Sequence, residues 1–295
     1  MRHDIVPARA PAGSRRLLRW AVPALIAILL AGGQAAAQSP SVVAVAETSA
    51  AALTRDEIVQ FLESARVVRS RDLPKGVTRP VRLTLTDGRL THDAVFSSVE
   101  ERVPIMRFRT GRTELDFVDS YRYSIAAYRL AVLLGLDDMV PVTVERGHDG
   151  RRGALSWWID AKWDEEQRIK QKLRPPDALA WVRQICRMRV FAQLLADADR
   201  NQGNMLITGD WKVWMIDFTR AFRRTRELPN PEDLRRCDRE LLARLRALTK
   251  EQVEETTKPF IGGAEIEPLM ARRDLILARF EHLVAERGEA AVMLD

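Results

Sequence analysis

Residues 196–222, which read ADADRNQGNMLITGDWKVWMIDFTRAF, are the stretch that decides the fold of this chain. Two short apolar runs, MLI at 205–207 and KVWMI at 212–216, flank the turn sequence TGDW at 208–211. Gly and Asp between residues that favour strands predict a β-hairpin. In an antiparallel hairpin, the residue before the first strand and the residue after the second strand share one open end.

The two residues at that open end are Asn204 and Asp217. An amide oxygen and a carboxylate that converge there form a hard-oxygen site suited to Mg²⁺ or Mn²⁺. Asp199 lies five residues before Asn204, in a polar loop that we expect to curl over the same end. Asp, Asn and Gly also cluster in ordinary turns. The long apolar helix predicted before this loop and the apolar strand before Asp217 favour a functional site.

The spacing of these residues resembles that of the protein-kinase family. Asp199 and Asn204 match the D-x-x-x-x-N of the kinase catalytic loop, and Asp217, followed by Phe218, stands where kinases carry the metal-binding aspartate of D-F-G. The sequence DRNQGN…IDF resembles the corresponding motifs of the phosphatidylinositol 3-/4-kinase-like branch and of the secretory-pathway kinases. The resemblance implies an α+β, two-lobed protein-kinase-like fold with a small β-rich N-lobe and a mostly helical C-lobe.

The same resemblance assigns roles to these residues. It implies that Asp199 is the catalytic base for an acceptor hydroxyl, and that Asn204 and Asp217 hold Mg²⁺ or Mn²⁺ on the phosphates of ATP. It leaves the acceptor open, as a protein, a lipid or a small molecule. Adenylyl transfer on the same fold is a further alternative.

The predicted elements follow the kinase order along the chain. Thr54 and Glu57 form a capping box that opens a short helix. Alternating apolar residues then predict strands, and a strongly apolar segment predicts a helix; the expected ranges are a hairpin at 82–99, a strand at 103–110, a helix at 119–136 and a strand at 139–144. A long helix is predicted from Asp177 to residue 195, with Leu179 and Phe191 in the core. We place the kinase-like domain at 54–295, its small lobe at about 54–159 and its large lobe at about 160–295.

One part of the kinase pattern is missing. The family has a strand lysine paired with a helix glutamate, whereas this chain has Ser97 and Ser124 at the matching positions and no G-x-G-x-x-G loop. Three interpretations stay open: the register differs, Arg107 and Arg109 bind the nucleotide instead, or the protein is a pseudokinase that binds a nucleotide or a partner. Arg107 and Arg109 share one strand face by the period of two and also fit a solvated face.

Two further segments have alternative interpretations. The run GALSWWI at 153–159 precedes the expected hinge, so Trp158 is predicted to line the nucleotide pocket, although a tryptophan pair also fits core packing. The basic segment at 220–226 is either a solvated face or a site for an acidic substrate or a phosphate.

The N-terminus has the features of an export signal. Residues 1–37 combine arginines, the apolar run AVPALIAILLA at 21–31 and the A-x-A site Ala35-Ala36-Ala37 before Gln38. The apolar run is short for a membrane span, so we expect no stable transmembrane anchor. We interpret 1–37 as a signal peptide and 38–53 as a linker, and we expect the protein to be exported to the periplasm or the extracellular space.

Composition excludes several other classes of function. The net charge is +6, but residues 1–37 hold five arginines and one aspartate, so +4 of it lies there and only +2 elsewhere, and we expect no nucleic-acid partner. The four histidines are scattered, and no G-x-S-x-G, H-E-x-x-H or C-x-x-C motif occurs. In an oxidising compartment, Cys186 and Cys237 either form a disulfide or stay as buried thiols.

Overall fold

The computed structural model describes residues 53–73, 80–108, 111, 113–197 and 199–295. The predicted signal peptide, the predicted linker up to residue 52, and Arg109 therefore lie outside the described residues. Within the described part of the chain, no helix combines the length and the apolar character that crossing a bilayer requires.

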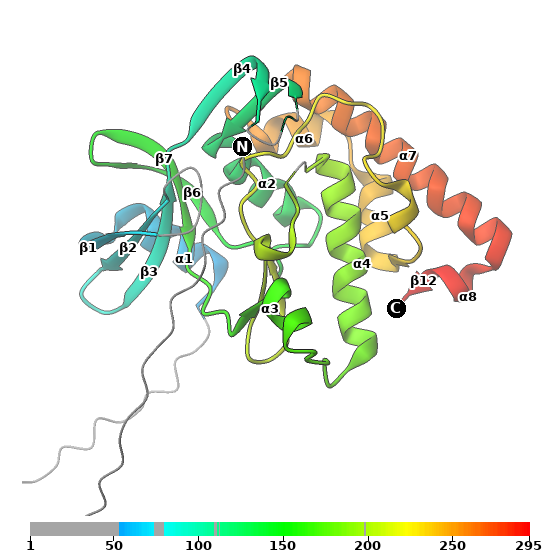
Figure 1. Ribbon diagram of the computed structural model, residues 1–295, viewed down its shortest axis with the longest axis horizontal. Helices are drawn as coiled ribbons and strands as arrows, with labels where there is room; N and C mark the ends of the chain where they lie inside the picture. The colour runs from blue at the N-terminus through cyan, green and yellow to red at the C-terminus, as the bar shows by residue number, and fades with distance from the viewer. Residues whose placement is uncertain (1–52, 74–79, 109–110, 112, 198) are drawn as a thin grey trace, which may run out of the picture. The chain divides into compact units, whose positions relative to one another are not determined.

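An antiparallel sheet of five strands forms the N-terminal part (Figure 1), in the order β1-β2-β3-β7-β6. Its strands are β1 (Arg66–Asp72), β2 (Val81–Thr86), β3 (Thr91–Ser97), β6 (Thr143–His148) and β7 (Arg151–Trp157). Helix α1 (Arg55–Ser64) begins with the predicted capping box of Thr54 and Glu57. The hairpin predicted at 82–99 is confirmed as β2 and β3.

The strand predicted at 139–144 begins only at Thr143. The preceding residues have other main-chain partners, because the carbonyl of Met139 accepts the Met215 N–H at 2.7 Å. The segment before β6 therefore connects the sheet to the C-terminal half of the domain.

A separate two-stranded ribbon departs further from the prediction. Strand β4 (Glu100–Arg107) corresponds to the strand predicted at 103–110, but it pairs with β5 (Thr113–Ser120) and not with the five-stranded sheet. Neither β5 nor β1 was predicted. Ser120 caps the helix α2 (Tyr121–Leu133), which lies within the predicted helical range of 119–136.

Helices make up most of the C-terminal part. Helix α4 (Ala178–Leu195) begins within one residue of the predicted start, and its N-cap is Asp177, whose carboxylate accepts the N–H groups of Leu179 and Ala180. The other elements are β8 (Trp163–Asp164), α3 (Glu165–Lys170), η1 (Gln202–Asn204), β9 (Met205–Ile207), β10 (Val213–Met215), η2 (Pro231–Asp233), β11 (Cys237–Asp238), α5 (Arg239–Ala247), α6 (Lys250–Thr257), α7 (Gly263–Arg287), α8 (Glu289–Val292) and β12 (Met293–Leu294).

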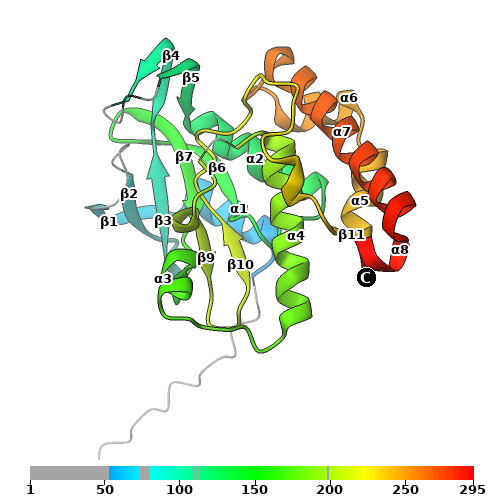
Figure 2. The ribbon, with the colours of Figure 1, turned by 45° about the vertical axis from the view of Figure 1, so that its right-hand side comes forward.

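Helix α4 supports the hairpin of β9 and β10, as Figure 2 shows. The Gln184 side chain on α4 accepts the Val213 N–H at 2.7 Å and donates to the Trp211 carbonyl at 3.2 Å. Phe191 of α4 is fully buried, as predicted, but Leu179 is 64% exposed, which corrects the prediction. The first turn of α4 is exposed, so the apolar period of the helix extends beyond the core.

The two cysteines are free thiols, and both are buried. Burial raises the pKa of the Cys186 thiol and of the Cys237 thiol above their ordinary values. Of the two predicted alternatives, the structure has the buried thiols.

The contrast between buried Phe191 and exposed Leu179 on α4 leads to a stability prediction. We expect Phe191→Ala to lower the free energy of unfolding by about 3–5 kcal/mol, because it removes a ring from the closed core. We expect the control Leu179→Ala on the same helix to change it by no more than about 0.5 kcal/mol. Urea unfolding followed by circular dichroism measures both changes, and equal losses would contradict the burial described above.

Candidate active site

The hairpin predicted from the quoted stretch is confirmed as β9 and β10, with Met205 opposite Met215. The Ile216 N–H donates to the Asn204 carbonyl at 3.1 Å and so extends the pairing by one step. Asn204 and Asp217 therefore lie at the same open end of the hairpin. Both residues line one large cavity.

The Asn204 side chain has a defined orientation. Its Nδ2 donates to the Asp199 carbonyl at 2.9 Å, and the same carbonyl accepts the Asn201 N–H at 2.7 Å. The amide nitrogen is thus used to hold the loop, and Oδ1 is the atom of Asn204 suited to a cation. Asn201 Oδ1 in turn accepts the Gly203 N–H at 2.8 Å.

Asp217 has an unusual backbone for a residue that is not glycine. Its φ is 56°, in the left-handed region that Asp tolerates better than most residues. Its Oδ1 accepts the Thr219 hydroxyl at 2.9 Å. Asp217 is exposed to the cavity that it lines, and desolvation by the surrounding protein raises the pKa of its carboxyl group. The negative charge of Asp199 raises that pKa further.

A buried ion pair between Asp197 and Arg200 holds the loop that carries Asp199. Asp197 has a side chain with 0% exposure, and Arg200 Nε donates to its Oδ2 at 2.9 Å. Arg200 Nη1 also donates to the carbonyls of Asn204 at 2.8 Å and Ile216 at 2.7 Å. The guanidinium of Arg200 lies 4.4 Å from the centre of the Phe218 ring.

Sequence reasoning missed the roles of Asp197 and Arg200. The available signal was the pair of opposite charges three residues apart next to the proposed base, but such pairs are common on surfaces. Only the burial of Asp197 shows that this pair is part of the site.

The cavity has a volume of about 750 Å³ and lies between the five-stranded sheet and the open end of the hairpin. Trp158, which was predicted to line a nucleotide pocket, lines this cavity. Ser97 and Ser124 line it too, so the positions matched to the kinase Lys–Glu pair do face this space without a charge. The Ser97 hydroxyl is buried and has no hydrogen-bond partner among the described residues.

The proposed arginine replacement is not supported for Arg107. This residue is exposed at the end of β4 and is not among the described residues that line the cavity. The physical reason is that β4 pairs with β5 in a separate ribbon, which removes Arg107 from the sheet above the cavity. Arg109 lies outside the described residues.

Two arginines of the basic segment after Asp217 are paired with one buried acid, whereas Arg226 of the same segment has a side chain that is 67% exposed. Arg220 Nη2 donates to both carboxylate oxygens of Glu114, each at 2.8 Å, and Arg223 forms a second ion pair with Glu114. Glu114 belongs to β5 and is 7% exposed. The Ser120 N–H, at the end of β5, donates to the Thr219 carbonyl at 2.9 Å.

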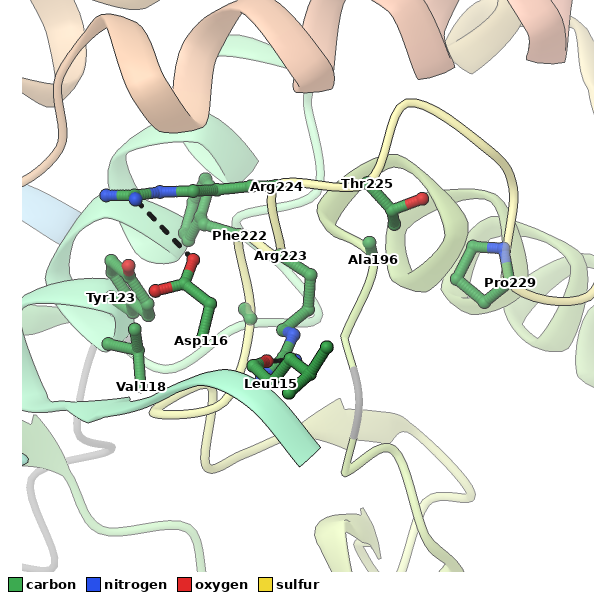
Figure 3. Close-up of a pocket in the computed structure, with 11 residues that line it drawn as sticks. Leu115, Asp116, Val118, Tyr123, Ala196, Phe222, Arg223, Arg224, Thr225 and Pro229 are labelled. Carbon is green, nitrogen blue, oxygen red and sulfur yellow. Dashed lines mark hydrogen bonds and ion pairs between the residues drawn. The ribbon is translucent and has the colours of Figure 1, made fainter. Parts of the chain in front are cut away.

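A second cavity, of about 360 Å³, lies where this segment meets β5 (Figure 3). Arg224 and Asp116 face each other across it, with 3.5 Å between Nη1 and Oδ2. Arg224 Nη2 also lies 3.0 Å from Glu265 Oε1, and this contact raises the pKa of Arg224. Each arginine of the segment that borders this cavity is thus paired with an acid.

Known proteins resemble this chain in fold, but no sequence family matches it. No family model matches this sequence, and no curated protein matches it. Solved structures do match: hydra Fam20 with sugar has a TM-score of 0.61 at 14% identity, over 81% of this chain and 92% of that one. The Golgi casein kinase with Mn/ADP bound has a TM-score of 0.57 at 11% identity, over 81% of this chain and 78% of that one.

These likenesses confirm the predicted α+β, two-lobed kinase-like fold. Both neighbours have the atypical, secretory-pathway kinase-like form of that fold. The neighbours do not specifically support the phosphatidylinositol 3-/4-kinase-like branch that the sequence also resembled.

The buried ion pair leads to a prediction about stability. We expect Arg200→Met to lower the free energy of unfolding by about 3–5 kcal/mol, because the charge of Asp197 would stay buried without a partner. Adding Asp197→Leu should restore part of that loss, since no buried charge then remains. Urea unfolding of both variants measures the difference, and the same loss in the double variant would show that the pair is not the cause.

Proposed function

We propose that the protein is an exported, kinase-like phosphotransferase that uses metal-bound ATP. The observation that carries this proposal is the meeting of Asn204, Asp217 and the Asp199 loop at one end of a hairpin. Asn204 and Asp217 line a cavity whose volume of about 750 Å³ suits a nucleotide. The Mn and ADP of the Golgi casein kinase structure support the same ligands here.

The side chains present at this end fit a divalent cation. Asn204 Oδ1 and the Asp217 carboxylate are hard oxygen ligands, and both residues line the cavity. These two residues would hold Mg²⁺ or Mn²⁺, which when bound neutralises charge on the nucleotide phosphates. Thr219 holds one oxygen of Asp217, and Arg200 keeps the two strand ends at a constant spacing.

Asp199 would receive the proton of the acceptor hydroxyl. Its side chain is exposed and accepts only the Asn201 amide, at 3.1 Å, among the described residues, so an acceptor can reach it. The Asn204 amide and the Asn201 N–H both hold its main chain. A base in this fixed position would raise the reaction rate by orienting the acceptor as well as by accepting its proton. The acceptor is a protein, a lipid or a small molecule, and we propose no nucleic-acid partner.

A second candidate function is a pseudokinase that senses a nucleotide or binds a partner. The observation that favours it is that Ser97 and Ser124 leave the cavity without the charge pair that grips phosphates in kinases. Transfer of an adenylyl group on the same fold remains a third possibility for the same site. A binding measurement followed by a transfer assay distinguishes these functions.

We expect ATP with Mg²⁺ or Mn²⁺ to raise the melting temperature of the purified protein, because a ligand that binds only the folded state stabilises it. At a ligand concentration of about 100 times Kd the gain is about 2.7 kcal/mol. Asp217→Ala should abolish the shift. The control Asp210→Ala, in the turn at the closed end of the same hairpin, should keep it. Differential scanning fluorimetry measures all three proteins.

The absence of any shift in the unaltered protein would reject the nucleotide claim. A shift without transfer of phosphate or AMP, tested with radiolabelled ATP, would favour the sensor. Loss of transfer in Asp199→Asn with unchanged ATP binding would support the proposed role of Asp199 as the base.

We also expect export to remove residues 1–37. Mass spectrometry of the protein recovered from the periplasm or the medium should find Gln38 as its first residue, because the A-x-A site ends at Ala37. The control Ala35→Arg and Ala37→Arg, which blocks the small-residue site, should retain the longer chain. Recovery of the unaltered protein only in the cytoplasm would contradict export.

A further inference from the structure

Arg82 on β2 is the only lysine or arginine among the described residues that line the large cavity. The other charged groups in that lining are the carboxylates of Asp160, Asp164 and Asp217. Ser97, which faces the same space, carries no charge. Arg82 was not predicted as a site residue.

Arg82 is held in one place by two neighbours. Its guanidinium carbon lies 3.8 Å from the centre of the Trp158 ring. Its Nε donates to Asp93 Oδ2 at 2.5 Å, and the Asp93 carbonyl accepts the Trp158 N–H at 3.1 Å. The indole Nε1 of Trp158 donates to Asp160 at 3.0 Å. The arginine, the carboxylate and the indole thus form one preorganised unit.

The strand register places Arg82 in the part of the cavity wall that the five-stranded sheet forms. Arg82 is the Cα partner of Val95 on β3, and Val95 is the partner of Ser156 on β7. All three residues line the cavity, so they form a row across the sheet beside Trp158. Asn204 and Asp217 line the same cavity from the hairpin, which belongs to a different sheet.

The chemistry of Arg82 favours a flat ligand over a phosphate. Asp93 already neutralises its charge, so a phosphate would have to compete with a carboxylate for the guanidinium. A planar guanidinium still attracts an aromatic ring through stacking. The indole of Trp158 next to it offers an aromatic surface for the same ligand. A lysine in the same place would keep the charge but would lack the plane.

We propose that Arg82 and Trp158 form the platform on which the purine base of the nucleotide stacks. This inference rests on the proposed nucleotide-dependent function and adds the residues that bind the base. The phosphates then extend from this platform toward Asn204 and Asp217, and Arg82 does not hold them.

The test compares three probes on the unaltered protein and on Arg82→Lys: ATP with Mg²⁺, adenosine, and inorganic tripolyphosphate with Mg²⁺. We expect Arg82→Lys to weaken ATP and adenosine by the same factor, about 3- to 30-fold, since one stacking contact is lost. Tripolyphosphate should bind with unchanged affinity. Isothermal titration calorimetry measures all three dissociation constants.

Two further variants keep the test independent of folding. Trp158→Leu should weaken ATP and adenosine together and leave tripolyphosphate unchanged. Arg89→Lys is the matched control, because Arg89 is exposed in the turn after the same strand and should change none of the three affinities. Arg82→Lys retains a positive charge beside Asp93, so its melting temperature without ligand should stay close to that of the unaltered protein.

The outcomes separate this inference from the proposed function. If the unaltered protein binds neither ATP nor tripolyphosphate, the proposed function is rejected together with the platform. If it binds ATP but Arg82→Lys and Trp158→Leu leave ATP affinity unchanged, only the platform is rejected. A loss of tripolyphosphate affinity in Arg82→Lys, or no adenosine binding by the unaltered protein that binds ATP, also rejects the platform.

Discussion

The buried ion pair between Asp197 and Arg200 is the constraint on which the candidate active site depends. A carboxylate with no exposed surface needs a partner within the protein, and Arg200 is that partner. The same guanidinium binds the carbonyls of Asn204 and Ile216, one from each strand of the hairpin. A buried pair of this kind contributes little net stability compared with apolar packing. Its effect here is geometric, because it sets how far apart the two proposed metal-binding residues lie.

The same segment is also joined to the small lobe, by a route that does not need a lysine–glutamate pair. Glu114 on β5 binds Arg220 and Arg223, and the Ser120 N–H binds the Thr219 carbonyl. Because α2 begins directly after Ser120, these contacts hold the start of that helix next to Asp217. Ser97 and Ser124 face the cavity without a charge, yet the helix that carries Ser124 is still tied to the proposed metal-binding segment. The ribbon of β4 and β5 therefore links the helix that carries Ser124 to the segment that follows Asp217.

Local patterns predicted the parts of this site that are close in sequence. The hairpin was predictable because Gly209 and Asp210 stand between two apolar runs, and its open end follows from strand pairing alone. The start of α4 was predictable because Asp177 is an N-cap before a helical period. The spacing of apolar residues along a helix does not show where the core ends. It therefore predicted that Leu179 is buried, whereas Leu179 is exposed. It also does not specify which strand is a partner, so the pairing of β4 with β5, separate from the five-stranded sheet, was not predicted.

The sequence by itself determined the hairpin of β9 and β10 and the convergence of Asn204 and Asp217 at its open end, because both depend on hydrogen bonds between near neighbours along the chain. Only the tertiary structure decided which charges meet across the fold. Glu114 with Arg220, and Arg82 with Trp158, come from segments far apart in the sequence, and no local pattern specifies such partners. Their pairing is set by the register of the sheets and by the cost of leaving a charge buried without a partner.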